Sequence, residues 1–484
     1  MNAPAKILNR PLFWVVTAFL LRVPSAWLCV IRYSDNLGFL YRGAGLWRGF
    51  SAPIPMWMRL APPATPLVLG WLCYLPAHWI DPAAFLCTAT CGALLVFPVG
   101  AMCARRGFSP VWGMAAAALL HPLIYTATLF DYQPLFPLAL LAGINGLEAG
   151  GRSRWLGFFS LAIAALGRAE GALLAPVAAG LIALNADGAS AESRNRQRFA
   201  MIALAASVAA VAAWGLLFWR QHGIFPYFHY AASNLHMEID PPAQSRQALL
   251  QAAGLQGLPE RLGDIAWAAL RHIPWWLFSA LPGALFFLLP TLPWGWLVLC
   301  RRSAGRWWPR DPIPLLMILH FFILLPFWAS RHHAAAFLAT SLPALGAGMS
   351  DLRARLPRLF ILAASATLLL SLWRVGRYYS AAESPLPNSP GYERLLAGEP
   401  LYMTDDLTLL DQHRERWLGA AKMPLLDSGA PPQQWQAMAR EFPELHGAWV
   451  HAEVGATGGP PGLPDRCLEY AGGKLCHFPL TGRE

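Results

Sequence analysis

The apolar stretch PPATPLVLGWLCYLPAHWI, residues 62–80, decides how this chain is organised. Its length is close to the ~20 residues with which a helix crosses a bilayer. It opens on Pro62 and Pro63, however, and has a third proline at Pro66. Prolines suit the first turn of a helix rather than its interior, so they favour a break in the chain and a new helix start. Whether this stretch crosses a membrane determines on which side every later loop lies.

The composition is that of a membrane protein. Of the 484 residues, 56% are hydrophobic and 13% are charged, and the mean hydropathy is +0.39. A soluble domain carries about 25% charged residues. The first apolar run, residues 11–31, is too long and too rich in tryptophan for a secretory signal, and no small-residue cleavage site follows it. We therefore expect it to be retained as a membrane span.

Further apolar runs recur up to residue 375, and the sequence predicts an all-α polytopic membrane protein with about 11 transmembrane helices. The predicted spans are 11–31, 83–104, 110–129, 132–149, 155–168, 170–186, 199–219, 272–300, 311–329, 333–349 and 357–375.

The placement of basic residues decides the status of 62–80. If this stretch does not cross, the basic residues that follow most spans fall on one face, which positive-inside counting makes cytoplasmic. These residues are Lys6, Arg10, Arg105, Arg106, Arg152, Arg154, Arg194, Arg196, Arg198, Arg301, Arg302, Arg306, Arg310, Arg353, Arg355 and Arg358. If it does cross, Arg105 and Arg106 fall outside and every later loop changes side. The basic residues of those loops would then lie on the opposite face from the basic residues of the N-terminus. We therefore predict that 62–80 forms a helix in the outer interface, and the same arginines explain the net charge of +10 without a nucleic-acid partner.

This topology places two long loops, 32–82 and 220–271, and the C-terminal tail on the outer face. The tail, 377–484, holds more acidic residues than all of the chain before it. Residues 400–404 are typical of a short strand, and 405–417 and 432–441 of helices. The sequence thus predicts a transmembrane domain, 1–376, and a small soluble α/β domain, 377–484, in the periplasm.

The cysteines lie in two kinds of sequence, the apolar stretches and the polar tail. Six cysteines lie in apolar stretches, where they are expected only to pack. Cys467 and Cys476 lie in the polar tail, where an oxidising compartment would permit a disulfide. The sequence leaves open whether they are bridged.

Ionisable groups at span ends are the candidate functional residues, because charge near a bilayer is costly. Asp35 follows the first span and could deprotonate an acceptor hydroxyl or amine, although solvated loop acids are also common. Asp131 lies in the tight turn Leu129–Pro134, where it could act in the site, cap the next helix, or both.

Two further polar groups lie on the predicted outer face. Arg168 and Glu170 share one turn, where they either pair with each other or contact a substrate. Arg331, His332 and His333 open the tenth predicted span. The planar guanidinium suits phosphate and the histidines add donors, whereas the alternative is anchoring of a helix end at the interface.

The sequence holds no P-loop, no Rossmann glycine pattern, no HExxH and no nucleophile elbow. Nothing in it therefore indicates ATP or a nucleotide sugar as a substrate.

The order of these features resembles the GT-C superfamily of membrane glycosyltransferases, which includes the protein O-mannosyltransferases and the lipid A aminoarabinose transferases. The family pattern has an arginine in the first span, an acidic motif and a tyrosine in the first outer loop, a Pro-Pro segment, a second acid, an Arg-x-Glu-Gly turn and a late Arg-His stretch. The matching positions here are Arg22, Asp35, Tyr41, Pro62–Leu67, Asp131, Arg168–Gly171 and Arg331–His333 before Leu342–Leu345. The family's paired acids are reduced here to Asp35-Asn36.

The resemblance implies an inverting transferase that takes a sugar from undecaprenyl or dolichyl phosphate and passes it to an envelope glycan, lipid or protein at the periplasmic face of a bacterial inner membrane. Asp35 would be the base, and Arg331, His332 and His333 would bind the donor phosphate.

The same resemblance assigns Asp131 to orienting the acceptor or holding a metal, with Tyr41, Arg168 and Glu170 in support. Some family members use a divalent cation such as Mg²⁺ or Mn²⁺ and others use none, so a cation requirement stays open.

Two other functions fit part of the pattern. A lipid-linked saccharide transporter or flippase would also have many spans, but transporters often show internal repeats and midplane charges, whereas no repeat is evident here. The second alternative function is that of a non-catalytic GT-C-like assembly subunit. This alternative stays open because Asn36 stands where the family has a second acidic residue.

Overall fold

The computed structural model of the chain describes residues 10–29, 43, 62–125, 134–186, 190–222, 226, 291–302, 311–324, 331–382, 402–404, 432–441, 447–451, 464–470 and 473–479. The chain divides into two compact units. The first comprises Met1–Leu28, Leu60–Ala64 and Phe85–Tyr379, and the second comprises Cys29–Arg59, Thr65–Ala84 and Ser380–Glu484.

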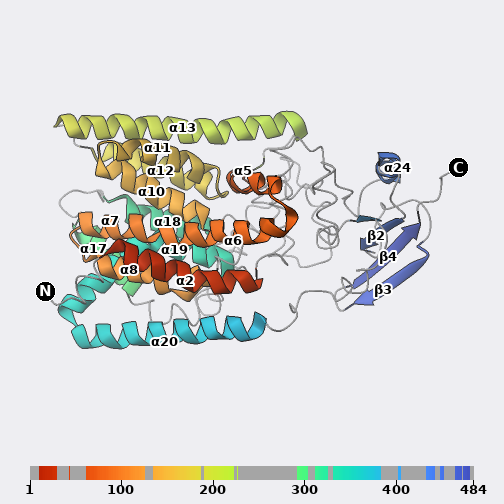
Figure 1. Cartoon of the computed structure of the whole chain (residues 1–484). Helices are drawn as coiled ribbons and strands as arrows, with labels where there is room; N and C mark the ends of the chain where they lie inside the picture. Colours follow the sequence, from red (N-terminus) through yellow and green to blue (C-terminus); the bar gives the residue numbers. More distant parts are fainter. Residues whose placement is uncertain are drawn as a thin grey trace. The chain divides into compact units, whose positions relative to one another are not determined.

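The first unit is helical throughout its described residues (Figure 1). Neighbouring helices pack in pairs, such as α10 on α11, α12 on α13 and α17 on α19. Among the described residues, the helices are α2 (Pro11–Cys29), α5 (Ala64–Gly70), α6 (Ala77–Leu94), α7 (Val96–Arg105), α8 (Pro110–Leu119), α9 (His121–Tyr125), α10 (Leu135–Ala149), α11 (Ser153–Ala165), α12 (Gly171–Leu184), α13 (Ala191–His222), α17 (Thr291–Arg302), α18 (Pro312–Leu324), α19 (Arg331–Arg355), α20 (Pro357–Ala382) and α24 (Pro432–Glu441).

Every predicted span contains a helix, but two differ in shape from the expectation. The run 83–104 is divided between α6, which begins at Ala77 and accommodates Pro82 near its start, and α7, which begins at Val96 after a turn at Leu95. The run 110–129 is not one helix. It breaks at Leu120, where the backbone is extended, and resumes as α9 with Pro122 in its first turn. Pro122 has no N–H to donate to the carbonyl of Ala118, which favours a break at this point.

A new helix starts after Pro62 and Pro63, as predicted, but the stretch 62–80 is not the single helix that was expected. Helix α5 begins directly after Pro62 and Pro63, and a 3₁₀ turn, η1 (Trp71–Tyr74), follows it before the chain extends at Leu75. At ~1.5 Å per residue for α5 and ~2 Å for η1, the two together reach roughly 18 Å, which is short of the ~30 Å of a hydrocarbon core. The stretch therefore does not form one spanning helix.

The helix lengths and surfaces suit a membrane protein. Among the described residues, Pro82–Arg105 and Ala191–Arg220 are long and apolar enough to cross a bilayer by length and composition, and shorter apolar helices accompany them. Leu156, Leu217 and Leu362 are each more than half exposed. Such outward-facing leucines on α11, α13 and α20 are the surface expected of helices that face lipid. The total of about 11 spans stays a prediction, because 272–290 and 325–330 lie outside the described residues.

Glycines let several helices approach closely. At the crossing of α17 and α19, a Cβ on Gly295 would lie 1.9 Å from the carbonyl oxygen of Ala344, and one on Gly348 would lie 2.3 Å from that of Thr291. Small residues of this kind replace the hydrophobic driving force that helices lack inside lipid. Close van der Waals packing of backbones therefore holds this pair together.

The second unit contains a four-stranded sheet in the order β1-β2-β4-β3. β1 (Tyr402–Thr404) pairs parallel to β2 (Gly447–His451), whereas β4 (Gly473–Pro479) pairs antiparallel to both β2 and β3 (Arg466–Tyr470). The strand and the helix predicted near 400–404 and at 432–441 are present as β1 and α24. The helix predicted over 405–417 lies outside the described residues.

The sheet settles the question of the two tail cysteines. Cys467 on β3 is directly opposite Cys476 on β4, their Cα atoms are 4.1 Å apart, and they form a disulfide. Trp435 of α24 and Trp449 of β2 are completely or almost completely buried. A cross-link between neighbouring strands together with buried tryptophans stabilises this small segment, which alone has little apolar core to bury.

Gly295→Ala should lower the thermal unfolding midpoint of the detergent-solubilised protein, because the added methyl group meets backbone that cannot move away cheaply. The expected loss is about 1–3 kcal/mol. Gly180→Ala is the matched control, since its Cβ would lie 4.0 Å from the nearest side chain. Equal midpoints for the two variants would show that the α17–α19 crossing is not tightly packed.

Replacing both Cys467 and Cys476 by serine should destabilise the C-terminal segment by about 2–3 kcal/mol, the loop-closure entropy for so short a loop. In the native protein neither cysteine should react with a thiol reagent until a reductant is added, and mass spectrometry of proteolytic peptides reads this directly. Labelling of both cysteines without reduction would contradict the disulfide.

Candidate functional site

Arg106 ties three helix ends together at one end of the helical unit. Its Nη2 donates to Glu148 Oε1 at 2.8 Å and to Asp311 Oδ1 at 2.9 Å. Burial lowers the pKa of Arg106, but the carboxylates of Glu148 and Asp311 raise it more, so the pKa lies above its usual range and the side chain stays charged. The turn after α7, the end of α10 and the start of α18 therefore share one end, as predicted for the basic face.

The opposite helix ends meet around the turn between α11 and α12. The N–H of Ala64, the first residue of α5, donates to the carbonyl of Leu166 at 2.9 Å. A Cβ on Gly171 would lie 2.0 Å from the carbonyl oxygen of Ala164 and 3.0 Å from the ring of Phe136. This turn therefore packs closely against the start of α10, which follows the loop that carries Asp131.

Arg168 and Glu170 pair within that turn. The Nε of Arg168 donates to Glu170 Oε1 at 2.8 Å, and its Nη2 lies 2.7 Å from the same oxygen. The two side chains are 1% and 6% exposed. The sequence left open whether they pair or contact a substrate, and the structure shows the pair. A buried ion pair needs good geometry to offset its desolvation, so it fixes the shape of this turn.

His320 of α18 is a buried polar residue that sequence reasoning missed. Its Nδ1 lies 2.9 Å from Thr340 Oγ1, and that hydroxyl donates to the carbonyl of Phe337. Thr340 has one hydroxyl hydrogen and donates it to Phe337, so its oxygen can only accept from His320. We therefore assign the ring proton of His320 to Nδ1. The rings of Phe136 and Phe337 pack edge-on against the imidazole. The available signal was the histidine itself, because an ionisable residue inside an apolar run is a functional candidate.

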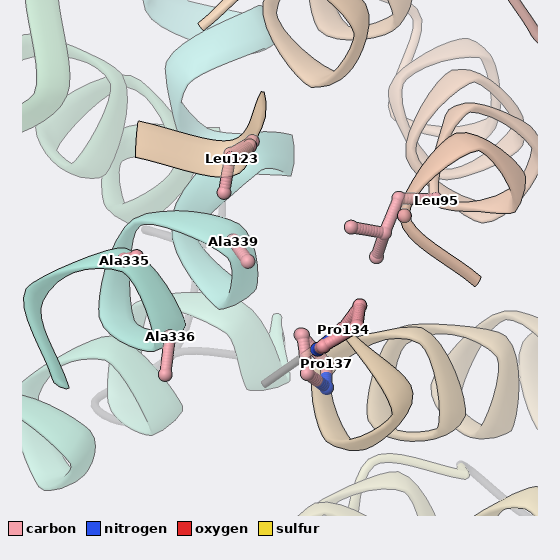
Figure 2. A pocket seen from close by; sticks show the side chains of 8 residues that line it. Leu95, Leu123, Pro134, Pro137, Ala335, Ala336 and Ala339 are labelled. Atoms are coloured by element: carbon pink, nitrogen blue, oxygen red, sulfur yellow. The ribbon is translucent and has the colours of Figure 1, made fainter. Parts of the chain in front are cut away.

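A small apolar pocket lies in the helical unit (Figure 2). Figure 2 shows Ala336 and Ala339 on one side of it and Leu95 and Pro137 on the other. Its complete lining is Gly92, Leu95, Leu123, Pro134, Pro137, Ala335, Ala336 and Ala339. The lining therefore combines the α6–α7 junction, α9, the start of α10 and the first turns of α19.

The pocket lies between the segments that carry two of the predicted site groups. Pro134 follows the loop of Asp131, and Ala335 follows Arg331, His332 and His333 on α19. By helical register, the backbone of His332 shares the face of α19 that carries Ala335, Ala336 and Ala339.

The remaining predicted residues cannot be placed. Asp35, Tyr41 and Asp131 lie outside the described residues, as do the side chains of Arg331, His332 and His333. Within the described part of the chain no three His, Cys, Asp or Glu residues gather as metal ligands. Asp35 and Asp131, the carboxylates expected to hold a cation, lie outside these residues, so the cation requirement stays a prediction of the sequence.

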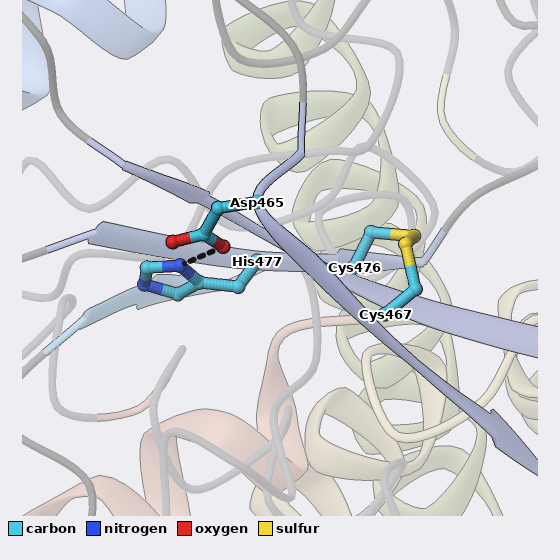
Figure 3. The surroundings of a disulfide bond; sticks show 4 residues. All are labelled: Asp465, Cys467, Cys476 and His477. Carbon is cyan, nitrogen blue, oxygen red and sulfur yellow. Dashed lines mark hydrogen bonds and ion pairs between the residues drawn. A yellow bond between two sulfur atoms is a disulfide. The ribbon is translucent and has the colours of Figure 1, made fainter.

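The sheet of the second unit carries a separate polar pair (Figure 3). His477 Nδ1 lies 2.7 Å from Asp465 Oδ1. His477 follows Cys476 on β4, and Asp465 directly precedes β3, the strand that carries Cys467. His477 also packs its ring 5.0 Å from that of Trp449 and covers Gly447. These contacts join three strands, and they explain why the residues are present without requiring a ligand.

Glu170→Gln should destabilise the protein by about 3 kcal/mol, because it removes the carboxylate charge that Arg168 faces inside the bundle. The double variant Arg168→Met/Glu170→Met removes both charges and should lose much less. Thermal unfolding in detergent measures both. An unchanged midpoint for Glu170→Gln would mean that the ion pair does not hold the α11–α12 turn.

No protein-family model and no curated protein matches the sequence. Among solved structures, the chain is similar to ArnT from Cupriavidus metallidurans bound to undecaprenyl phosphate, with 14% identity and a TM-score of 0.53 over 98% of this chain and 99% of that one. It is also similar to the Archaeoglobus fulgidus oligosaccharyltransferase in complex with Zn and sulfate, with 13% identity and a TM-score of 0.48 over 91% and 67% of the two chains. The match to ArnT confirms the expected resemblance at the level of the fold, because the chain shares the fold of ArnT over nearly the whole length of both chains.

Proposed function

We propose that the protein is an inverting glycosyltransferase that moves a sugar from a polyprenyl-phosphate donor to an envelope glycan, lipid or protein. The observation that carries this proposal is the shared fold with ArnT over nearly the full length of both chains. ArnT was solved with undecaprenyl phosphate bound. Because one fold can host several functions, the proposal also depends on the residues around the helix ends described above.

The proposed reaction is a single displacement. The acceptor oxygen or nitrogen bonds to the anomeric carbon while the bond from that carbon to the lipid phosphate breaks, so the configuration inverts. Asp35 takes the proton of the acceptor. The electron pair leaves on the phosphate oxygen, where Arg331, with His332 and His333, stabilises the growing negative charge.

The position of these residues on α19 supports phosphate binding. Arg331 begins this long helix, and a helix N-terminus carries partial positive charge and free N–H groups. One to two turns further along, Ala335, Ala336 and Ala339 line the apolar pocket. A polar helix start next to an apolar pocket suits a ligand that joins a phosphate to a hydrocarbon.

The disulfide supports a periplasmic site in a bacterial inner membrane. Disulfides persist in oxidising compartments, so the bond between Cys467 and Cys476 favours a tail outside the cytoplasm. The basic end around Arg106 is then cytoplasmic by the positive-inside rule. The α11–α12 turn and the start of α19 belong by alternation to the periplasmic side.

The test combines binding and transfer. Native mass spectrometry of the full chain with undecaprenyl phosphate should show affinity ten- to a hundredfold lower for Arg331→Ala, because one charge-assisted contact is worth that much. Asp35→Asn should keep binding but abolish the glycan on envelope material in cells with no other copy. Arg358→Ala, an exposed arginine at the start of α20, is the matched control and should change neither.

Unchanged glycan in both Asp35→Asn and Arg331→Ala would sink the transferase proposal. Lipid binding that needs Arg331, together with glycan that does not need Asp35, would instead indicate a carrier of lipid-linked saccharide.

A further inference from the structure

Arg22 is a fully buried arginine in the middle of α2, and its guanidinium is committed to backbone carbonyls. Nη2 donates to the carbonyl of Ala117 at 2.8 Å, and Nη1 donates to those of Ala18 at 3.0 Å and Ala118 at 3.4 Å. Two of these three acceptors belong to another helix, α8. The planar fork of an arginine therefore joins α2 to the end of α8.

The two α8 carbonyls are the ones that the break at Leu120 exposes. In a continuous helix, Ala117 and Ala118 would accept from residues 121 and 122. Leu120 is extended, however, with φ −68° and ψ 120°, and Pro122 has no N–H. Carbonyls without partners are costly inside a membrane, and the C-terminal end of a helix also favours a cation. Arg22 thus supplies hydrogen-bond donors to the carbonyls of Ala117 and Ala118 and a positive charge at the C-terminal end of α8.

The Arg22 side chain lies against Gly92, a residue that lines the apolar pocket. A Cβ on Gly92 would be 2.7 Å from Arg22 Nε and 3.1 Å from its Cδ. Leu123, on the α9 turn that follows the break, lines the same pocket. The chain after α9 leads into the loop of Asp131 and returns at Pro134, which also lines the pocket.

We propose that Arg22 is a positioning residue that holds the α8–α9 break in place and so fixes one wall of the pocket and the start of the Asp131 loop. Its role in sugar transfer rests on the function proposed above. It acts through α9 rather than by touching the donor.

This role requires the geometry of arginine and not merely its charge. A lysine ammonium is a point donor that cannot serve carbonyls on two helices with a planar fork. Arg22→Lys should therefore behave like Arg22→Met, whereas a purely electrostatic role would be rescued by lysine. Gly92→Ala offers an independent perturbation, since its methyl group displaces the guanidinium without removing it. Thr17→Val, which removes a hydroxyl bond to Phe13 within α2, is the control.

The experiment is hydrogen exchange of the full-length protein in detergent, read by mass spectrometry on peptides covering 117–125, alongside the envelope glycan of cells producing each variant. Arg22→Met, Arg22→Lys and Gly92→Ala should raise exchange in 117–125 about tenfold or more, as expected for lost hydrogen bonds to a charged group. Exchange in α12 should stay as in the wild type, and glycan should fall. Thr17→Val should change neither.

Each other outcome overturns a definite part of the proposal. Wild-type exchange in 117–125 for the Arg22 variants would show that Arg22 does not hold the break. Rescue by lysine would reduce its role to charge. Raised exchange with a normal amount of glycan would show that Arg22 holds the α8–α9 break but that sugar transfer does not depend on it. If wild-type cells carry no envelope glycan that depends on this protein, the proposed function fails. The exchange result still decides whether Arg22 fixes α9.

Discussion

The structure depends on one constraint: a charged side chain inside an apolar helical bundle needs a counter-charge beside it. Arg106, held between Glu148 and Asp311, binds the ends of three helices that are far apart in the sequence. Separating this cluster would leave charges without counter-charges in a poorly solvated place, which is strongly unfavourable. It therefore fixes which helix ends lie together. The alternation of helices then brings the other ends, including the α11–α12 turn, to the opposite side.

Among the described residues, buried polar side chains inside the helical unit make contacts that hold helices and turns together. The Arg168–Glu170 pair shapes one turn, the His320–Thr340 bond joins α18 to α19, and Arg22 satisfies the carbonyls at the α8 break. Between these contacts lies a pocket lined by alanine, proline, leucine and glycine. The arrangement is a rigid apolar frame whose polar residues hold backbone in position. For the transferase proposed above, such a frame would hold the proposed site residues in place relative to the donor and the acceptor.

Much of the helical architecture could be predicted because hydrophobic runs and prolines act locally. The break after Pro62 and Pro63 and the helix at 432–441 follow from residues within a few positions. The α8–α9 break was missed although Pro122 signals it, because the surrounding run is uniformly apolar. The partners of Arg22 and His320 could not be inferred, since their contacts join residues about a hundred and about twenty positions apart. The cysteine pairing likewise needed the register of β3 and β4.

The candidate site follows the same division. Pattern and resemblance singled out Arg168 and Glu170, and the structure shows how they pair; Asp35, Asp131 and Arg331 stay predictions. The most direct measurement is an electron cryo-microscopy structure of the full chain with undecaprenyl phosphate. The account predicts the phosphate within about 3 Å of Arg331, with Asp35 and Asp131 facing the same cavity. A phosphate at the Arg106 end, or Asp35 walled off from Arg331 by packed protein, would contradict it.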